Sequence, residues 1–264
     1  MRVLPIKGIR IGEGRPKTIV PIMDATTTEL LASARHAVDA GANCVEWRAD
    51  FLVDPHDADA LTHTAHALAA ALPTTPLIAT LRTKGQGGRL EAEAEEYAHL
   101  VRALAQQGSA DLVDIERGAG DDVVRALVEE VHRHGGHAIV SHHDFEGTPA
   151  TDRMCRILVE MTALGADLPK IAVMAQHPAE AARLMEATAC AAEQLDAPLL
   201  TMAMGRAGTI TRLTGESFGS ALTFCALEAA SAPGQVGLAQ ARAALDALHE
   251  ALAPEDHTTR GIRP

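Results

Sequence analysis

Short apolar segments alternate with longer segments of helical periodicity along most of the chain. Apolar residues 3–6 and 9–11, on either side of Lys7-Gly8, predict a small N-terminal hairpin. After it, apolar segments recur at intervals of roughly 25 to 35 residues, the cadence of a (β/α)8 barrel. The predicted strands are residues 18–23, 44–48, 77–82, 112–116, 138–143, 170–174, 199–204 and 222–226.

Helical periodicity fills the intervals between these strands. Examples are residues 29–40, 91–106 and 121–134. We therefore expect an α/β protein with a single domain over residues 1–264. In it, the hairpin takes residues 1–17, the barrel takes residues 18–254, and residues 255–264 form a flexible tail.

The strands decide between a (β/α)8 TIM barrel and a doubly wound sheet, because both folds show this rhythm. Side chains alternate between the two faces of a strand. One face of the predicted strands is apolar, whereas the other collects polar groups, which are expensive to bury under helices. These groups are Glu46, Arg48, Thr80, Arg82, Asp114, Glu116, Ser141, His143 and Lys170. They favour a barrel whose lumen opens at its C-terminal end, although a purely structural polar core is the alternative.

Composition narrows the possible partners. The chain carries a formal charge of −12, which argues against a nucleic-acid or anionic-membrane surface. Its four cysteines are widely separated and form no zinc or disulfide signature, so we expect reduced thiols. The N-terminus lacks the long apolar region of a signal peptide and no apolar run approaches a bilayer span. A cytoplasmic protein is therefore expected.

Lys170 has the most unusual position of the four lysines in the chain. It stands at the head of a buried strand, where loss of solvation should lower its pKa and give a nucleophilic amine. Such amines form Schiff bases with ketones. The alternative is a strand-end lysine that is paired with a carboxylate.

Several motifs in this order resemble the type I 3-dehydroquinate dehydratases, the Schiff-base class of the shikimate pathway. The resemblance covers nearly the whole chain. Its motifs are Glu46-Trp47-Arg48, Arg82 followed by Gly87-Gly88, Ser141 to Phe145, Pro169-Lys170-Ile171, Gly208 to Arg212, Glu216 to Ser220 and Ser231 to Gln235.

The resemblance implies a lyase that dehydrates 3-dehydroquinate to 3-dehydroshikimate without a metal or organic cofactor. It implies that Lys170 is the Schiff-base lysine and that His143 transfers protons. It also implies a set of substrate-binding residues: Glu46, Arg48 and Arg82 at the ring hydroxyls, Arg212 at the carboxylate, and Ser231 and Gln235. A cytoplasmic homodimer of the aromatic biosynthesis pathway is expected on the same ground.

The chemistry requires these residue types. A protonated imine acidifies the neighbouring C–H bond, and a histidine can take that proton and later assist departure of the hydroxyl group. Strand parity favours His143 over His142, because His143 shares a face with Ser141. Residues 231–235 are rich in small side chains and suggest a mobile lid, with an ordinary turn as the alternative.

Two residues depart from the family pattern. Gln86 stands where the family usually has a glutamate that orients the catalytic histidine. We therefore expect a lower histidine pKa and a slower proton step than in the usual family member. Pro21 replaces a small hydroxyl residue and removes one polar contact.

Two other functions compete with this interpretation. A Schiff-base aldolase acting on a sugar also uses a lysine in a barrel, but would normally have a phosphate site after the last two strands. A catalytically impaired barrel that binds a shikimate-like ligand is the second rival, motivated by Gln86 and Pro21. The cluster of His132, His134 and His137 suggests a metal site only weakly, since it lies at a predicted helix end.

Overall fold

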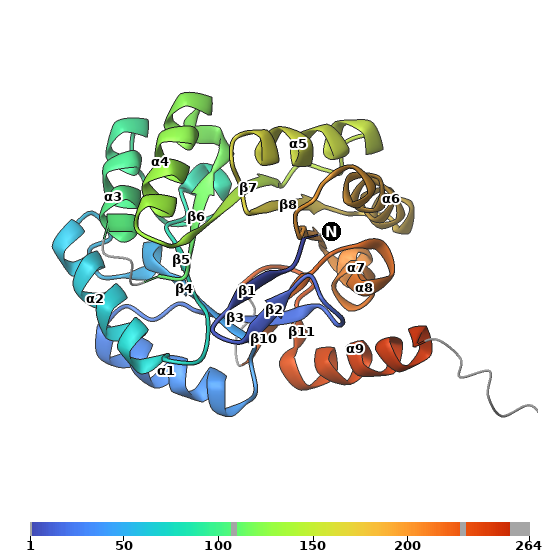
Figure 1. The fold of residues 1–264 in the computed structure, drawn as a ribbon, viewed down its shortest axis with the longest axis horizontal. Coiled ribbons are helices and arrows are strands. Elements are labelled where there is room, and N and C mark those ends of the chain that lie inside the picture. Colours follow the sequence, from blue (N-terminus) through green and yellow to red (C-terminus); the bar gives the residue numbers. More distant parts are fainter. Residues whose placement is uncertain (1, 107–109, 228–230, 254–264) are drawn as a thin grey trace, which may run out of the picture.

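The apolar segments form parallel strands that close into a barrel, and the helices between them make an outer ring (Figure 1). The computed structural model describes residues 2–106, 110–227 and 231–253. The α/β barrel fold and the N-terminal hairpin predicted from the sequence are thus confirmed. The predicted tail, residues 255–264, lies outside the described residues.

The strands follow the predicted order. The hairpin consists of β1 (Leu4–Ile6) and β2 (Ile9–Ile11). The barrel strands are β3 (Lys17–Ile22), β4 (Cys44–Arg48), β5 (Leu77–Thr80), β6 (Leu112–Glu116), β7 (His137–Asp144), β8 (Leu168–Met174), β9 (Leu200–Met204) and β10 (Leu222–Ala226). A short strand that the sequence did not predict, β11 (Val236–Gly237), pairs in parallel with β10.

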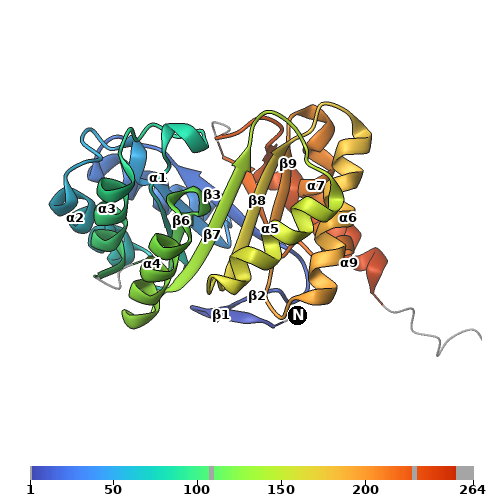
Figure 2. The same cartoon turned by 90° about the horizontal axis from the view of Figure 1, so that it is seen from above.

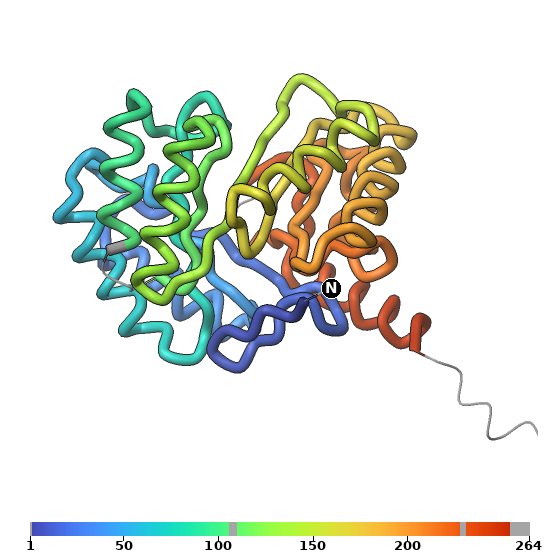
Figure 3. Tube along the Cα trace, turned by 45° about the horizontal axis from the view of Figure 1, so that its top comes forward, coloured from blue at the N-terminus to red at the C-terminus, as the bar shows by residue number. Residues whose placement is uncertain are grey.

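Each barrel strand up to β8 is followed by one long helix, and two short helices follow β9. The helices are α1 (Thr27–Asp39), α2 (Ala58–Ala71), α3 (Ala94–Gln106), α4 (Asp121–Arg133), α5 (Thr151–Ala163), α6 (Pro178–Gln194), α7 (Thr209–Leu213), α8 (Gly215–Phe218) and α9 (Leu238–Leu252). Short 3₁₀ turns are η1 (Ala49–Phe51), η2 (Lys84–Gln86), η3 (Arg117–Ala119) and η4 (Arg206–Gly208). In Figure 3, α9 returns beside the N-terminal part of the chain.

Several boundaries differ from the predicted ones by one to three residues, and hydrogen bonds explain two of these differences. The strand expected to end at residue 82 ends at Thr80, because the backbone N–H of Arg82 donates to the Asp50 carboxylate rather than to a strand. The helix expected from residue 91 begins at Ala94. Leu90 exchanges backbone hydrogen bonds with Arg82 and Lys84, so the chain leading into the helix is still part of the loop.

The barrel closes between β9 and β10 by a weaker seam than the other strand pairs. There the two strands share a single bridge between Leu199 and Ser220, and Ala221 N–H donates to the Leu199 carbonyl at 2.7 Å. The other neighbouring barrel strands form ladders of three to six paired residues. The seam therefore has fewer hydrogen bonds to resist separation.

The lower half of the lumen is apolar and packs on the hairpin. Each barrel strand contributes one side chain to this layer: Ile19, Cys44, Ile78, Leu112, Ile139, Leu168, Leu200 and Leu222. The hairpin residues Leu4, Ile6 and Ile11 belong to the same cluster, and Figure 2 shows the hairpin beneath the strands. The polar lumen expected from the sequence is therefore confined to the C-terminal half, above a dry floor.

Polar residues join the strands in pairs at their N-terminal ends. Asn43, Asp111 and Asp167 each directly precede an even-numbered strand, and each accepts a hydrogen bond from the first N–H groups of the strand before it. The oxygen–nitrogen distances are 3.0, 2.8 and 2.9 Å respectively. Asp167 in this way ties β7, which carries His143, to β8, which carries Lys170.

The hydrogen bond between Asp167 and the Ala138 N–H should stabilise the fold in a pH-dependent way. Although burial alone would raise the pKa of Asp167, hydrogen bonds from His137, the Ala138 N–H and His132 lower it from 3.8 to about 2. A depressed pKa means that the contribution is present above about pH 4 and is lost as the pH falls toward 2. We expect Asp167→Ala to lower the free energy of unfolding at pH 7 by about 1–3 kcal/mol, because it leaves a buried N–H without its acceptor.

Urea denaturation at pH 7 and at several pH values between 4 and 2 would measure this effect, and the difference from the wild type should narrow as the pH falls. Asp167→Asn should lower the free energy of unfolding less than Asp167→Ala, since the asparagine Asn43 forms the equivalent hydrogen bond between β3 and β4. The exposed Asp39 provides a control as Asp39→Asn. If the free energy of unfolding lost in Asp167→Ala does not change with pH, the stabilising role of the ionised Asp167 carboxylate is contradicted.

Candidate active site

A cavity of about 200 Å³ opens above the polar half of the lumen. Every site residue predicted from the sequence lines it: Glu46, Arg48, Arg82, Gln86, His143, Lys170, Arg212, Ser231 and Gln235. They come from strands or loops after β4, β5, β7, β8, β9 and β10. The structure therefore brings the set together, while the individual roles remain predictions. Pro21 is not among the lining residues.

Lys170 is buried in the lumen and pairs with two carboxylates. Its Nζ donates to Asp114 Oδ2 at 2.8 Å and lies 3.8 Å from Glu46 Oε1. The Phe224 ring also faces the ammonium, with 4.9 Å from Nζ to the ring centroid. The ion pair considered as an alternative is thus present, yet the same side chain lines the cavity, so pairing and exposure to a ligand coexist.

Arg82 and Asp114 form the centre of a buried charge network. Arg82 Nη2 lies 2.7 Å from Asp114 Oδ2, and Nη1 donates to Glu116 at 3.0 Å and to Ser141 at 3.0 Å. Burial alone would raise the pKa of Asp114, but the Arg82 and Lys170 charges hold it well below its usual range. Asp114 is therefore an ionised acceptor between two cations.

His143 extends into the cavity from β7, two residues beyond Ser141, which is in register with Lys170. Burial lowers the pKa of His143 well below its usual value, and the positive charges of Arg82 and Lys170 lower it further. The imidazole is neutral at pH 7 as a result. A neutral ring can accept a proton from a bound ligand.

Gln86 contacts His143 from η2. Its Oε1 accepts a hydrogen bond from the His143 backbone N–H at 2.9 Å and lies 3.3 Å from the ring Nδ1. Because an amide oxygen only accepts hydrogen bonds, this contact favours a proton on Nδ1 and leaves Nε2 as the basic atom. Gln86 therefore orients the ring but provides no charge.

Arg212 is a buried cation without a carboxylate partner among the described residues. Its side chain is in α7, and Nη2 donates only to the Pro233 carbonyl, at 3.4 Å. Nε and Nη1 are buried and have no hydrogen-bond partner. Burial lowers the pKa of Arg212 to about 10. An unpaired buried guanidinium at a cavity is a ready site for an anion, because leaving it without one is costly.

The position of α7 depends on a close approach between the backbones of Gly208 and Ala203. A Cβ added at Gly208, which precedes Thr209 at the start of α7, would lie 2.4 Å from the Ala203 carbonyl oxygen of β9. Only glycine permits that approach. The glycine thus lets the chain turn tightly from β9 into the helix that carries Arg212.

Arg48 is held in a fixed orientation by its neighbours. Its Nε and Nη2 donate to the two oxygens of Asp50, both at 2.8 Å, and its guanidinium lies 5.0 Å from the centroid of the Phe51 ring. Asp50 also accepts from the Arg89 backbone N–H at 3.0 Å. This bidentate pair leaves Arg48 with fewer free donors than Arg212.

The segment with Ser231 and Gln235 is closed by reciprocal hydrogen bonds. The Ser231 N–H donates to Gln235 Oε1 and Gln235 Nε2 donates to Ser231 Oγ, both at 2.7 Å. Pro233 in the same segment contacts Arg212 through its carbonyl. The segment therefore adjoins the unpaired cation at the cavity rim.

Apolar and aromatic walls were not predicted from the sequence. They are provided by Phe145, Ala172, Met202, Met204, Phe224, Ala232 and Pro233. Phe145 stacks near His143, with 6.1 Å between ring centroids. Strand parity is the signal that identifies Phe224 and Met202, since both share a face with the apolar floor residues Leu222 and Leu200.

The other histidines have different partners. His132 Nε2 lies 2.7 Å from Asp167 and His134 Nε2 lies 3.1 Å from Glu130. Within the described ranges, no group of three His, Cys, Asp or Glu side chains is placed to hold a metal ion. In the same part of the chain, every helix is too short or too polar to cross a membrane.

Comparisons with known proteins agree with the geometry. The family model for type I 3-dehydroquinase matches residues 18–251. A 3-dehydroquinate dehydratase of Bacillus licheniformis is 41% identical over 252 residues, with 95% of this chain and 99% of the relative covered.

Two solved structures have the same fold. The type I 3-dehydroquinate dehydratase of Clostridium difficile, described with covalently modified comenic acid, has a TM-score of 0.91 at 36% identity. It covers 95% of this chain and 99% of its own. The 3-dehydroquinate dehydratase of Geobacillus kaustophilus has a TM-score of 0.90 at 32% identity, with 94% and 97% covered. The chain belongs to the type I 3-dehydroquinase family.

Proposed function

We propose that this protein dehydrates 3-dehydroquinate to 3-dehydroshikimate through a Schiff base on Lys170, with His143 as the proton-transfer residue. Membership of the family supports the overall reaction. The observation that carries the substrate assignment is Arg212, a buried guanidinium with no carboxylate partner among the described residues, beside a lysine and a neutral histidine in one cavity. A carboxylated cyclic ketone complements all three groups.

The Schiff base forms when the amine of Lys170 attacks the substrate ketone and water departs. The ammonium must first give up its proton, because only the neutral amine is nucleophilic, and this proton leaves on the oxygen of the departing water. The resulting iminium keeps a positive charge at the same place. Asp114, which lies 2.8 Å from Nζ and is held ionised by Arg82, then stabilises that charge.

The proton step follows on the carbon beside the imine. His143 Nε2 removes this proton, and the electron pair moves into the iminium. The enamine then expels the β-hydroxyl group, which leaves as water with a proton from His143. Hydrolysis of the imine releases 3-dehydroshikimate and regenerates Lys170. One water leaves the substrate overall, and the water lost in imine formation is returned in hydrolysis.

The charge state of the lining residues divides their roles in binding. Arg212 holds the substrate carboxylate, since it is the lining arginine whose fork has no carboxylate among the described residues. Arg82 and Arg48 are already paired with carboxylates and meet the ring hydroxyls with their remaining donors, together with Glu46. Ser231 and Gln235 close the rim above Arg212.

The two rival functions receive less support. A sugar aldolase of this fold would need a phosphate site, whereas in the part of the chain that the structure describes the unpaired cation beside the cavity is a single arginine. An impaired binding barrel would retain the cavity but lose turnover. Formation of the enone product distinguishes the three, because only the dehydratase makes it from 3-dehydroquinate.

Lys170→Ala should abolish covalent capture and lower kcat by at least about 10³-fold, since the nucleophile is removed. Sodium borohydride added with 3-dehydroquinate should increase the intact mass of the wild type by one reduced ligand. The variant should show no increase. An adduct that persists in Lys170→Ala would place the Schiff base elsewhere, and a wild type with neither adduct nor enone absorbance would refute the proposed enzyme.

Arg212→Gln should lower kcat/KM by about 10²- to 10³-fold, because it removes a charged partner from a desolvated carboxylate. Steady-state kinetics by enone absorbance measures this change. Arg206→Gln is the matched control, as Arg206 is exposed on the same loop and does not line the cavity. Equal losses in the two variants would argue against a specific carboxylate contact.

Gln86→Glu should raise the pKa of His143, because a carboxylate beside the ring favours the imidazolium. His143 must be neutral to take the proton, so the acid limb of the kcat/KM profile should move to higher pH, with an optimum at higher pH or a higher rate. Gln86→Met, of similar size and without charge, should not move the limb upward. An unchanged pH profile in Gln86→Glu would refute a role for this position in the proton step.

A further inference from the structure

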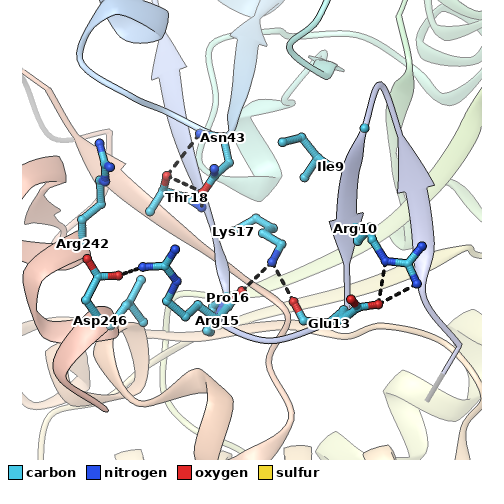
Figure 4. A pocket seen from close by; sticks show the side chains of 12 residues that line it. Ile9, Arg10, Glu13, Arg15, Pro16, Lys17, Thr18, Asn43, Arg242 and Asp246 are labelled. Atoms are coloured by element: carbon cyan, nitrogen blue, oxygen red, sulfur yellow. Dashed lines mark hydrogen bonds and ion pairs between the residues drawn. The ribbon is translucent and has the colours of Figure 1, made fainter. Parts of the chain in front are cut away.

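A second cavity, of about 330 Å³, lies at the opposite, N-terminal end of the barrel (Figure 4). It is bounded by the turn of the hairpin, the loop between β2 and β3, the first residues of β3, and α9. None of its lining residues belongs to the catalytic cavity. Any ligand here would therefore act apart from the reaction centre.

The lining is positively charged in a chain that is strongly negative overall. Four basic side chains meet two carboxylates there: Arg10, Arg15, Lys17 and Arg242 against Glu13 and Asp246. The whole chain carries −12. An excess of positive charge at one cavity of an acidic protein concentrates anions locally.

Both carboxylates are already engaged by the arginines. Arg10 Nε donates to Glu13 Oε2 at 2.6 Å, and Arg15 forms an ion pair with Asp246. Figure 4 shows Lys17 between these two pairs. Among the described residues, neither Lys17 nor Arg242 forms an ion pair, although Glu13 and Glu216 lie close enough to Lys17 to favour its charged form.

Lys17 reaches the cavity with one donor to spare. Its Nζ donates to the backbone carbonyls of Glu13 at 2.7 Å and Arg15 at 3.0 Å, which uses two of its three N–H groups. Burial lowers the pKa of Lys17, and the neighbouring Arg15 lowers it further. An anion at this position would offset the repulsion between Lys17 and Arg15.

Arg242 and Asn43 add further unused donors. Arg242 Nη1 donates to the Ala40 carbonyl at 3.4 Å, which leaves most of its fork free. The Asn43 side-chain oxygen accepts from Thr18 N and Oγ1, at 3.0 and 3.1 Å, so its NH₂ group remains available. Three segments that line this cavity thus carry donors for which the described residues provide no acceptor.

We propose that this cavity binds a small polyanion whose oxygens accept hydrogen bonds from Lys17, Arg242 and Asn43. The chemistry is that of a compact oxyanion with at least two negative charges, either a phosphoryl compound or a dicarboxylate. Arginine favours such groups because its fork donates two parallel hydrogen bonds. The ligand bridges the loop that precedes β3 and helix α9.

Isothermal titration calorimetry at constant ionic strength tests this site with inorganic pyrophosphate and with succinate as probes. We expect one-to-one binding of at least one probe, weakened at least about tenfold in Arg242→Gln and in Lys17→Gln. The probe that binds more tightly identifies the phosphoryl or the dicarboxylate class. Arg242 is on an exposed helix face, so this variant should fold and keep its kcat/KM even if Lys17→Gln loosens the loop.

Arg125→Gln is the matched control. Arg125 is also an exposed helical arginine whose Nη1 donates to a backbone carbonyl near the end of a neighbouring helix, Ala163 at 2.9 Å. The Arg125→Gln variant should bind the probe with the same affinity as the wild type. Binding of neither probe at millimolar concentration overturns the proposal, as does binding that survives Arg242→Gln. Loss of binding in Arg212→Gln alone would place the anion in the catalytic cavity and overturn it equally.

Discussion

The buried contact between Asp114, Arg82 and Lys170 is the interaction on which the site depends. Asp114 accepts from Lys170 at 2.8 Å while Arg82 lies 2.7 Å from the same oxygen. Isolated charges are too costly to bury, so none of the three could occupy the lumen without the others. The polar half of the barrel is stable because β6 and β8 provide Asp114 and Lys170, and the loop after β5 provides Arg82, two residues beyond Thr80.

The network also separates the arginines by availability. Arg82 is held by Asp114 and Glu116, and Arg48 is held by both oxygens of Asp50. Within the described ranges, the hydrogen-bond partner of Arg212 is a single backbone carbonyl, that of Pro233 at 3.4 Å. Three arginines that look equivalent in the sequence therefore differ in how strongly each needs an external anion.

Strand periodicity explains how much of the site could be predicted. Alternation along a strand is fixed by backbone geometry, so Glu46, His143 and Lys170 could be assigned to the lumen from the sequence. Pairing between strands depends on barrel register, which local patterns do not encode. Neither the Lys170–Asp114 ion pair nor the contact with Phe224 could be read from spacing.

The weak pairing of β9 with β10, where the barrel closes, could not be predicted from the sequence either. The sequence predicts β9 and β10 as ordinary strands, yet their seam is a single bridge and a few side-chain bonds through Ser220. Parallel strands pair through register and twist around the whole ring, and small mismatches accumulate where it closes. An N-terminal feature such as the Lys7-Gly8 turn is local by contrast, and its positive φ angles of 46° and 80° suit a tight hairpin.

Hydrogen bonding is distributed unevenly around the barrel. Asn43, Asp111 and Asp167 add bonds between neighbouring strands, whereas the seam between β9 and β10 has few. Asp167 and a ladder of six paired residues join β7 to β8, so the strands that carry His143 and Lys170 are held together by many hydrogen bonds. Arg212 follows β9 and the segment with Gln235 follows β10, so they stand on opposite sides of the seam. The least hydrogen-bonded wall of the barrel therefore lies only one strand beyond β8, which carries Lys170, and the contact of Arg212 with the Pro233 carbonyl spans this wall at the cavity.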